Sequence, residues 1–230
     1  MDFLPTKGIE YLLAIGYLLL LVPFWWLVVA RTGAPALATA DASRAPGWFS
    51  VPSGYHFHRG HTWAQPDEGG LLRVGMDDFA RLLLGRPEAL LLPAVGERLE
   101  QGEKGWRVQV GGHEVPLLSP AQGEVAEINH EAIANPNLVQ DDPYGRGWLL
   151  KIRTPRPGAG LKNLMPSSLA RPWMKQTTRQ LGTMMGADLG EVLQDGGVVV
   201  SGIARELGGE DWPRLAAEML LTDSEQESGL

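Results

Sequence analysis

Between about Ser53 and Thr154 the sequence breaks into short apolar stretches separated by turns that contain glycine, and this pattern constrains the fold most. Short strands at such spacing are typical of a β-barrel or a β-sandwich. We therefore predict a mainly β domain over residues 53–154. Its candidate strands are Leu71–Gly75, Ala89–Leu92, Trp106–Val110, Val115–Leu118, Glu124–Ile128 and Trp148–Ile152.

Two short helices are expected within this domain. Asp77 is placed to cap the first, which has Phe79, Leu82 and Leu83 on its apolar face. The second fits residues 131–135 and ends before a proline.

An uncharged segment of twenty residues, Tyr11 to Ala30, lies near the N-terminus. An α-helix of that length covers about 30 Å, the thickness of a bilayer's hydrocarbon core. Trp25 and Trp26 lie near one end and Tyr11 at the other, as interfacial anchors often do. We interpret residues 1–31 as a single-pass transmembrane anchor.

A cleaved signal peptide is the alternative for this segment. Lys7 would be its basic residue and Ala38-Thr39-Ala40 its cleavage site. The apolar core of a signal peptide is usually about 7–15 residues, shorter than this segment, so the anchor is favoured. Counting basic residues on either side gives only a slight lean toward a cytoplasmic domain.

Composition excludes several classes of function. A net charge of −7 argues against nucleic acid as a partner, because phosphate binding needs a basic surface. The absence of cysteine excludes disulfides, thiolate metal sites and iron–sulfur clusters.

The remaining segments flank the β domain. Residues 32–52 are rich in Ala, Pro and Gly, which is typical of a linker. Residues 155–222 show a mainly helical pattern, interrupted by Pro166 and Pro172, with a last helix opening at Trp212-Pro213. We interpret this C-terminal extension as a packed subdomain that can also dock a partner. Residues 223–230 form an acidic tail.

Several motifs in the β domain occur in a recognisable order. They are His61-Thr62-Trp63, Leu72 to Ala80 (LRVGMDDFA), Leu92-Pro93 with Val95-Gly96, Ser119-Pro120 with Gly123-Glu124-Val125, and Leu138-Val139 with Asp142 to Ile152 (DPYGRGWLLKI). Together they resemble the glycine cleavage system H-protein family over about 100 residues. The resemblance implies a barrel-sandwich hybrid fold, the architecture of lipoyl and biotinyl carrier domains. It also implies a lipoate-bearing lysine at the tip of a hairpin.

That lysine is missing. In the family it lies seven residues before the serine of the Ser-Pro motif, and here that position is Gly112. No lysine lies between Lys104 and Lys151. Lipoylation needs a primary amine on an exposed tip, so the resemblance does not carry its cofactor over. Lys104 would lie at the wrong end of the hairpin.

The hairpin itself is expected to survive. Gly111-Gly112 suits a two-residue turn, because glycine adopts positive φ without strain. Val108 should then face Val115, and Val110 should face His113. Gly111, Gly112, His113 and Glu114 form the candidate partner contact, although a solvent-facing polar turn is the simpler interpretation of His113.

Other candidate chemistry is weak. His56, His58 and His61 lie within six residues and would suit a metal by type, but we favour a structural or surface role because no cysteine joins them. No phosphate loop, nucleophile elbow or H-E-x-x-H motif occurs. We therefore expect no catalytic residue, no metal and no cofactor.

The sequence supports two hypotheses for function. The first is a non-catalytic, membrane-tethered H-protein-like domain without lipoate. It would be a scaffold or subunit of a membrane-associated complex, for example an oxidoreductase, with protein partners of unknown identity. The alternative is a true lipoyl carrier in glycine decarboxylation, modified at Lys104.

Overall fold

The computed structural model describes residues 16–17, 19–20, 49–155, 157–184 and 201–222. The chain divides into two units, Met1–Ala42 and Ser43–Leu230. Within the described ranges, no helix is both long and apolar enough to cross a membrane. The anchor predicted over residues 11–30 lies outside the described residues, apart from four helical ones, Gly16, Tyr17, Leu19 and Leu20. The acidic tail and most of the predicted linker also lie outside them.

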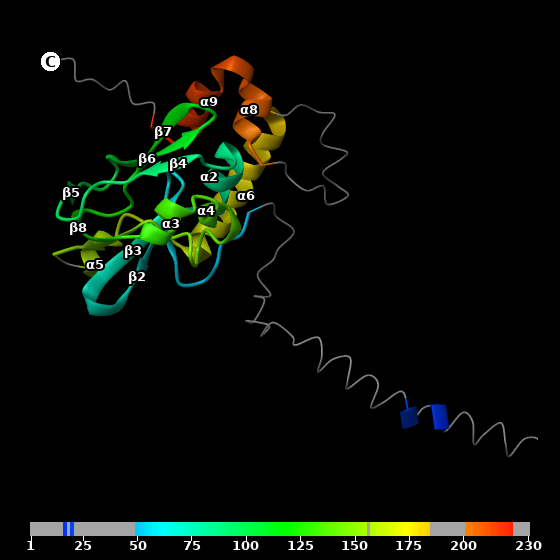
Figure 1. Cartoon of the computed structure of the whole chain (residues 1–230), viewed down its shortest axis with the longest axis horizontal. Coiled ribbons are helices and arrows are strands. Elements are labelled where there is room, and N and C mark those ends of the chain that lie inside the picture. The colour runs from blue at the N-terminus through cyan, green and yellow to red at the C-terminus, as the bar shows by residue number, and fades with distance from the viewer. Residues whose placement is uncertain (1–15, 18, 21–48, 156, 185–200, 223–230) are drawn as a thin grey trace, which may run out of the picture. The chain divides into compact units, whose positions relative to one another are not determined.

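A seven-stranded antiparallel sheet forms the larger layer of the second unit (Figure 1). Its strand order is β10-β1-β2-β3-β9-β8-β5. The strands are β1 (His56–His58), β2 (Thr62–Pro66), β3 (Leu71–Met76), β5 (Arg98–Leu99), β8 (Gly123–Ile128), β9 (Leu150–Arg153) and β10 (Met165–Pro166). A short 3-10 helix, η1 (Glu68–Gly70), joins β2 to β3.

The smaller sheet has three strands in the order β4-β6-β7. They are β4 (Ala89–Leu91), β6 (Lys104–Val110) and β7 (His113–Leu118). The two sheets confirm the prediction of a mainly β domain. All six candidate strands are present, whereas β1, β2, β5 and β10 were not foreseen because they are short or lack a run of apolar residues.

Helix α2 (Asp78–Leu84) begins where the sequence predicts. The Asp77 side chain accepts a hydrogen bond from the N–H of Ala80 at 2.9 Å, which satisfies one of the free donors of the first turn. Phe79, Leu82 and Leu83 are buried, as expected. The second predicted helix is α3 (His130–Ala134), one residue earlier than expected. It is followed by α4 (Leu138–Asp141) and, after β9, by α5 (Pro157–Gly160).

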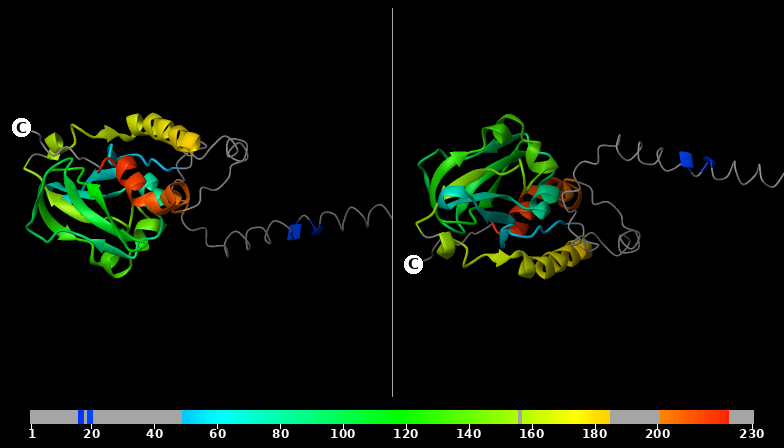
Figure 2. Two further views of the ribbon diagram at one scale, coloured as in Figure 1. Left: turned by 90° about the horizontal axis from the view of Figure 1, so that it is seen from above. Right: turned by 90° about the horizontal axis from the view of Figure 1, so that it is seen from below.

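The C-terminal extension is helical where it is described. Its elements are α6 (Ser167–Met184), α8 (Ile203–Gly208), η2 (Gly209–Asp211) and α9 (Trp212–Met219). Helix α6 lies along one side of the domain, and α8 and α9 lie at the end that holds the β6–β7 hairpin (Figures 1 and 2). Leu181, Ile203, Trp212 and Leu220 belong to the same buried cluster as the β domain, so the extension shares its core.

Pro172 does not interrupt α6, contrary to the sequence prediction. A proline inside a helix removes the hydrogen bond from its own nitrogen to the carbonyl four residues earlier. Here that residue is Ser168, and both Ser168 and Pro172 are exposed. Water can therefore satisfy the freed carbonyl, and the helix continues.

The last residues of the predicted linker pack against the domain. Phe49 contacts the ring of Phe79 edge-on, with centroids 5.1 Å apart. The backbone N–H of Ser50 donates to the Asp78 carboxylate at 2.8 Å, and Val51 is buried. The packing of the described domain thus includes residues 49–51, at the end of the predicted linker.

Candidate functional site

The β6–β7 hairpin has the register that the sequence predicts. Val108 pairs with Val115, and Val110 pairs with His113. Gly111 and Gly112 form the turn with φ of 57° and 76°, a region that favours glycine over other residues. We call residues Gly111–Glu114 the hairpin tip.

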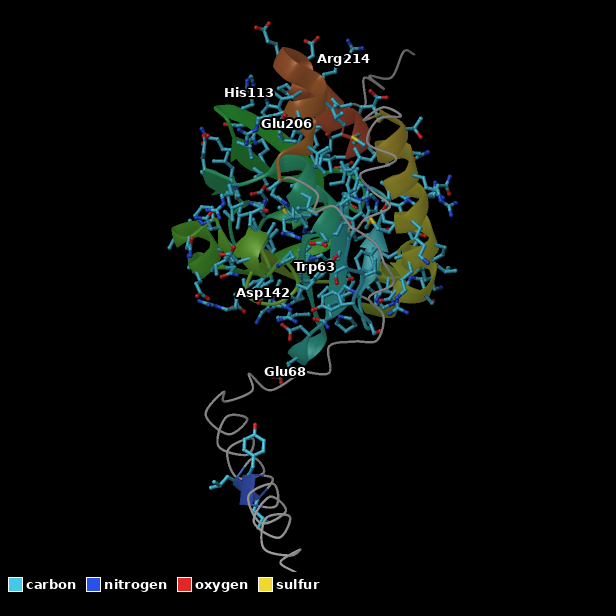
Figure 3. The ribbon with its side chains drawn as sticks, turned by 90° about the vertical axis from the view of Figure 1, so that its right-hand side faces the viewer. Trp63, Glu68, His113, Asp142, Glu206 and Arg214 are labelled. Atoms are coloured by element: carbon cyan, nitrogen blue, oxygen red, sulfur yellow. The ribbon has the colours of Figure 1, made fainter. Side chains whose placement is uncertain are left out.

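The hairpin tip lies against the chain's own C-terminal helices. The ring of His113 meets the ring of Trp212 edge-on, with centroids 5.4 Å apart. Trp212 is buried, and the guanidinium of Arg205 lies 5.6 Å from its ring centroid. A side chain at Gly111 would point at Arg205 and Trp212, at 3.6 and 3.7 Å. Figure 3 shows His113 beside α8 and α9.

Gly112 differs from Gly111 in its surroundings. A side chain added there would meet no described atom within 4 Å, so it would project into open space. The Gly112 N–H donates weakly to Glu88, at 3.3 Å. The neighbouring Glu114 forms an exposed ion pair with Arg107 at 3.4 Å. The position is therefore accessible, but it offers no amine.

Lys104 lies at the opposite end of the hairpin. It opens β6 and pairs with Leu118 at the close of β7. Val110 lies six residue steps further along the strand, roughly 20 Å away at the usual rise. The residues of this hairpin therefore do not fit a lipoyl group at the tip, since the tip has no amine and the hairpin's lysine lies at its other end.

The three histidines have separate surroundings. His56 and His58 share one face of β1, and burial lowers the pKa of both. The Nδ1 of His58 accepts a hydrogen bond from the N–H of Gly60 at 3.0 Å. Among the described residues, no group of three or more His, Cys, Asp or Glu is placed to hold a metal.

His61 is buried and paired with Asp77. Its Nδ1 lies 2.9 Å from the Asp77 carboxylate, and both side chains are almost fully shielded from water. The imidazole is stacked between Phe79 and Trp173, with centroids 4.0 and 4.7 Å away. His61 has φ of 59°, so its backbone is held in a conformation that only the surrounding contacts make acceptable.

A cavity of about 870 Å³ opens beside this stack. His61 and Phe79 form its domain side, and α6 and α9 supply most of its other walls. Three methionines line it, Met165, Met184 and Met219, with Arg59 and Glu218 also in its walls. The His61–Asp77 pair thus borders a space that exists only because the C-terminal extension packs here.

A hydrogen-bond network around Tyr144 joins distant segments of the domain. Its hydroxyl donates to the Ser50 carbonyl at 2.9 Å and accepts from the N–H of Asp78 at 3.1 Å. Burial raises the pKa of Tyr144 well above its usual value, and the charges of Asp77 and Asp78 raise it further. Burial also raises the pKa of the Asp78 carboxyl, opposed by the Ser50 N–H and by Arg81. These hydrogen-bond and ion-pair partners all lie within the domain, so their contacts stabilise the fold.

The sequence predicted the hairpin tip but not the two C-terminal helices, α8 and α9, that contact it. Trp212 and Arg205 lie about 100 residues further along the chain, and no local pattern links them to His113. The His61–Asp77 pair was also missed, although both residues belong to motifs that carried the resemblance. A search for polar residues within buried motifs would have found it.

About half of the chain is similar to known proteins. The model of the family described as glycine cleavage H-protein matches residues 55–177, which includes the first part of α6. A probable glycine cleavage system H protein of Natronomonas pharaonis is 38% identical over 104 residues, covering 45% of this chain and 82% of that protein. The glycine cleavage system H protein of Carboxydothermus hydrogenoformans is 36% identical over 102 residues, covering 44% and 78%.

Among solved structures, the glycine cleavage system H protein of Mycobacterium marinum is similar to this chain. The TM-score is 0.46 and the sequence identity 30%, and the match covers 51% of this chain and 93% of that one.

Proposed function

Because the chain belongs to the glycine cleavage H-protein family, we propose that it is a member that carries no lipoate and acts as a non-catalytic, membrane-tethered scaffold or subunit. Its partners would be proteins of a membrane-associated complex. An oxidoreductase complex is the candidate assembly, by analogy with the places where carrier domains work.

The observation that carries this proposal is Gly112. The hairpin keeps its register and its turn, and position 112 stays open to solvent. Only the amine is absent, and an amide to lipoate cannot form without it. A domain with this fold but no attachment point for lipoate can still bind other proteins through its surface. It cannot carry a covalently bound group at the tip.

The contact between the hairpin tip and the C-terminal helices supports a scaffold. A carrier presents its modified tip to partner enzymes, so that tip needs to be free. Here Trp212 and Arg205 lie against the Gly111–His113 side of the tip, and Trp212 is part of the buried core. One side of the tip therefore contacts the chain's own helices, while residues 111–114 stay exposed.

The buried polar pair supports a non-catalytic role. His61 and Asp77 hold each other in the interior, and Asp77 also caps α2 through the N–H of Ala80. Each of these contacts stabilises a local conformation, and none needs a substrate to explain it.

The membrane tether rests on the sequence. Residues 11–30 are uncharged and long enough as a helix to span a hydrocarbon core, with aromatic residues near both ends. The Ala- and Pro-rich residues that follow would let the β domain stand away from the bilayer.

The experiment is an intact-mass measurement on the full chain, purified in mild detergent from its native membrane together with whatever binds it. We expect the unmodified mass and a stable set of protein partners. The matched control is Gly112→Lys purified in the same way, because it restores an amine at the open position.

Two results would overturn the proposal. A solitary, unmodified monomer would remove the scaffold role. A natural chain heavier by one lipoyl group would revive the carrier alternative, and peptide mapping would then ask whether Lys104, the exposed lysine at the far end of the hairpin, bears it.

A further inference from the structure

We propose that the exposed basic side of α6 rests on anionic lipid headgroups of the membrane to which the chain is tethered. This inference relies on the proposed membrane tether and adds a second contact with the same bilayer. Its partner is a lipid surface with negative charge.

Helix α6 differs in charge from the rest of the chain. It contains Arg171, Lys175 and Arg179 and no acidic residue, whereas the whole chain has a net charge of −7. The three basic residues are spaced four apart, so they form one row along the helix. A basic row on a helix surface is typical of binding to anionic membranes.

The basic row is available for binding. The buried side of α6 is formed by Ser167, Ala170, Met174, Thr177 and Leu181. Lys175 and Arg179 are exposed on the other side, and Arg171 lies at its edge. None of the three forms an ion pair with an acidic residue in the part of the chain that is described.

The start of the described domain lies beside α6. The Ser167 hydroxyl lies 2.7 Å from the Pro52 carbonyl and 2.9 Å from the Tyr55 carbonyl. Arg171 donates to the Ser53 hydroxyl at 3.0 Å. The segment that begins at Phe49 therefore runs beside the first turns of α6 (Figures 1 and 2).

The linker length permits the contact. Residues 31–48 span at most about 60 Å when extended, and a flexible chain is usually much shorter than its extended length. The domain thus stays near the membrane to which the chain is tethered, within reach of its lipid headgroups.

One apolar side chain adds to the exposed side of α6. Leu169 is 60% exposed. Apolar side chains commonly enter the headgroup region beside basic residues. Each Lys or Arg near an anionic surface strengthens binding roughly fivefold, and salt screens the effect.

An acidic surface on a partner protein is the competing occupant, and the experiment distinguishes the two. The full chain has no cysteine, so single cysteines can be labelled specifically. Gln176→Cys places a fluorophore on the exposed side of α6. Gln122→Cys is also exposed and lies directly before β8, outside α6.

The purified chain is reconstituted into vesicles of phosphatidylcholine with or without phosphatidylserine, some lipids bearing a headgroup quencher. In vesicles that contain phosphatidylserine, we expect strong quenching of the fluorophore at position 176 and little at position 122. This difference between the two positions should disappear in vesicles of phosphatidylcholine alone and at 0.5 M salt. Lys175→Gln with Arg179→Gln should weaken docking roughly 25-fold. Arg98→Gln with Arg107→Gln, the same change in net charge elsewhere, should leave quenching unchanged.

The outcomes separate the two proposals. If the chain does not float with vesicles, the tether is wrong. If it floats but position 176 is quenched no more than 122, or equally in neutral vesicles, the α6 contact is overturned. Protection of position 176 from the quencher only when co-purified proteins are present would overturn it in favour of an acidic partner.

Discussion

Two regions of this domain differ in how strongly packing constrains their residues. They are the motif residues in the interior and the hairpin tip. We call His61, Trp63, Gly75 and Asp77 the motif interior. All four lie within β2 and β3 or directly beside them, and all match the family's motifs. At the hairpin tip, Gly111 and Gly112 form the turn, and neither carries an amine on a side chain.

The motif interior is held by contacts that leave little freedom. The indole N–H of Trp63 donates to the carbonyls of Met76 and Pro143, at 2.9 and 3.2 Å. Trp63 pairs with Gly75 across the sheet, and a side chain there would lie 2.7 Å from the indole. Figure 3 shows Trp63 inside the domain. Glycine is therefore required at position 75 by packing.

The hairpin tip has no such requirement at position 112. Its side-chain direction is open, and its backbone conformation suits glycine at least as well as lysine. A lysine at this position would therefore gain no packing and would carry some backbone strain. The difference teaches that packing determines some positions of this domain and leaves others open, because the residues that stabilise the fold and those at the tip are separate sets.

The largest effect is expected from Trp63→Ala. It removes a fully buried indole and its two hydrogen bonds, so the free energy of unfolding should fall by about 4 kcal/mol. Urea unfolding followed by circular dichroism measures it. Trp148→Ala, which removes a half-buried tryptophan, is the control and should cost about half as much. Equal losses of free energy of unfolding in the two variants would show that Trp63 stabilises the domain no more than a half-buried tryptophan does.

The next effect is expected from Trp212→Ala, which tests whether the tip is engaged within the chain. We expect a loss of about 3 kcal/mol in the free energy of unfolding. Hydrogen exchange of the backbone amides of Val110 and His113 should also become faster, because the tip loses its ring contact with Trp212. Leu221→Ala, at an exposed leucine, is the control. Unchanged exchange at the tip would contradict the contact.

Asp77→Ala should have a smaller effect. It removes the cap of α2 and leaves His61 without its buried partner, for a loss of about 2 kcal/mol in the free energy of unfolding. Asp141→Ala, at an exposed aspartate in α4, is the matched control. If thermal and urea unfolding show the same loss in both variants, the pair does not stabilise the domain.

The smallest effect is expected from Gly112→Lys. A non-glycine residue at φ of 76° costs about 1 kcal/mol, and the open position adds no clash. Gly112→Gln has similar length without the amine, so the two variants should lose equal free energy of unfolding. A much larger loss in the lysine variant would mean that charge at the tip, not backbone conformation, decides which residue is tolerated.

Local patterns were enough for part of this structure. Gly111-Gly112 between alternating apolar residues determined the turn and the register of the hairpin, since both depend on neighbours in the chain. Asp77 as a helix cap is equally local. Pro172 shows the limit of such rules, because the proline penalty is real but small where the freed carbonyl meets water.

The sequence by itself determined the family, the mainly β domain and the glycine turn of the hairpin, because each rests on residue identity at fixed spacing. Only the tertiary structure decided that Trp212 contacts one side of the hairpin tip, that His61 pairs with Asp77, and that α6 turns its basic row outward beside the start of the described domain. These arrangements depend on contacts between residues far apart in the chain. Such contacts form through packing of whole elements, and no local pattern records which faces will meet.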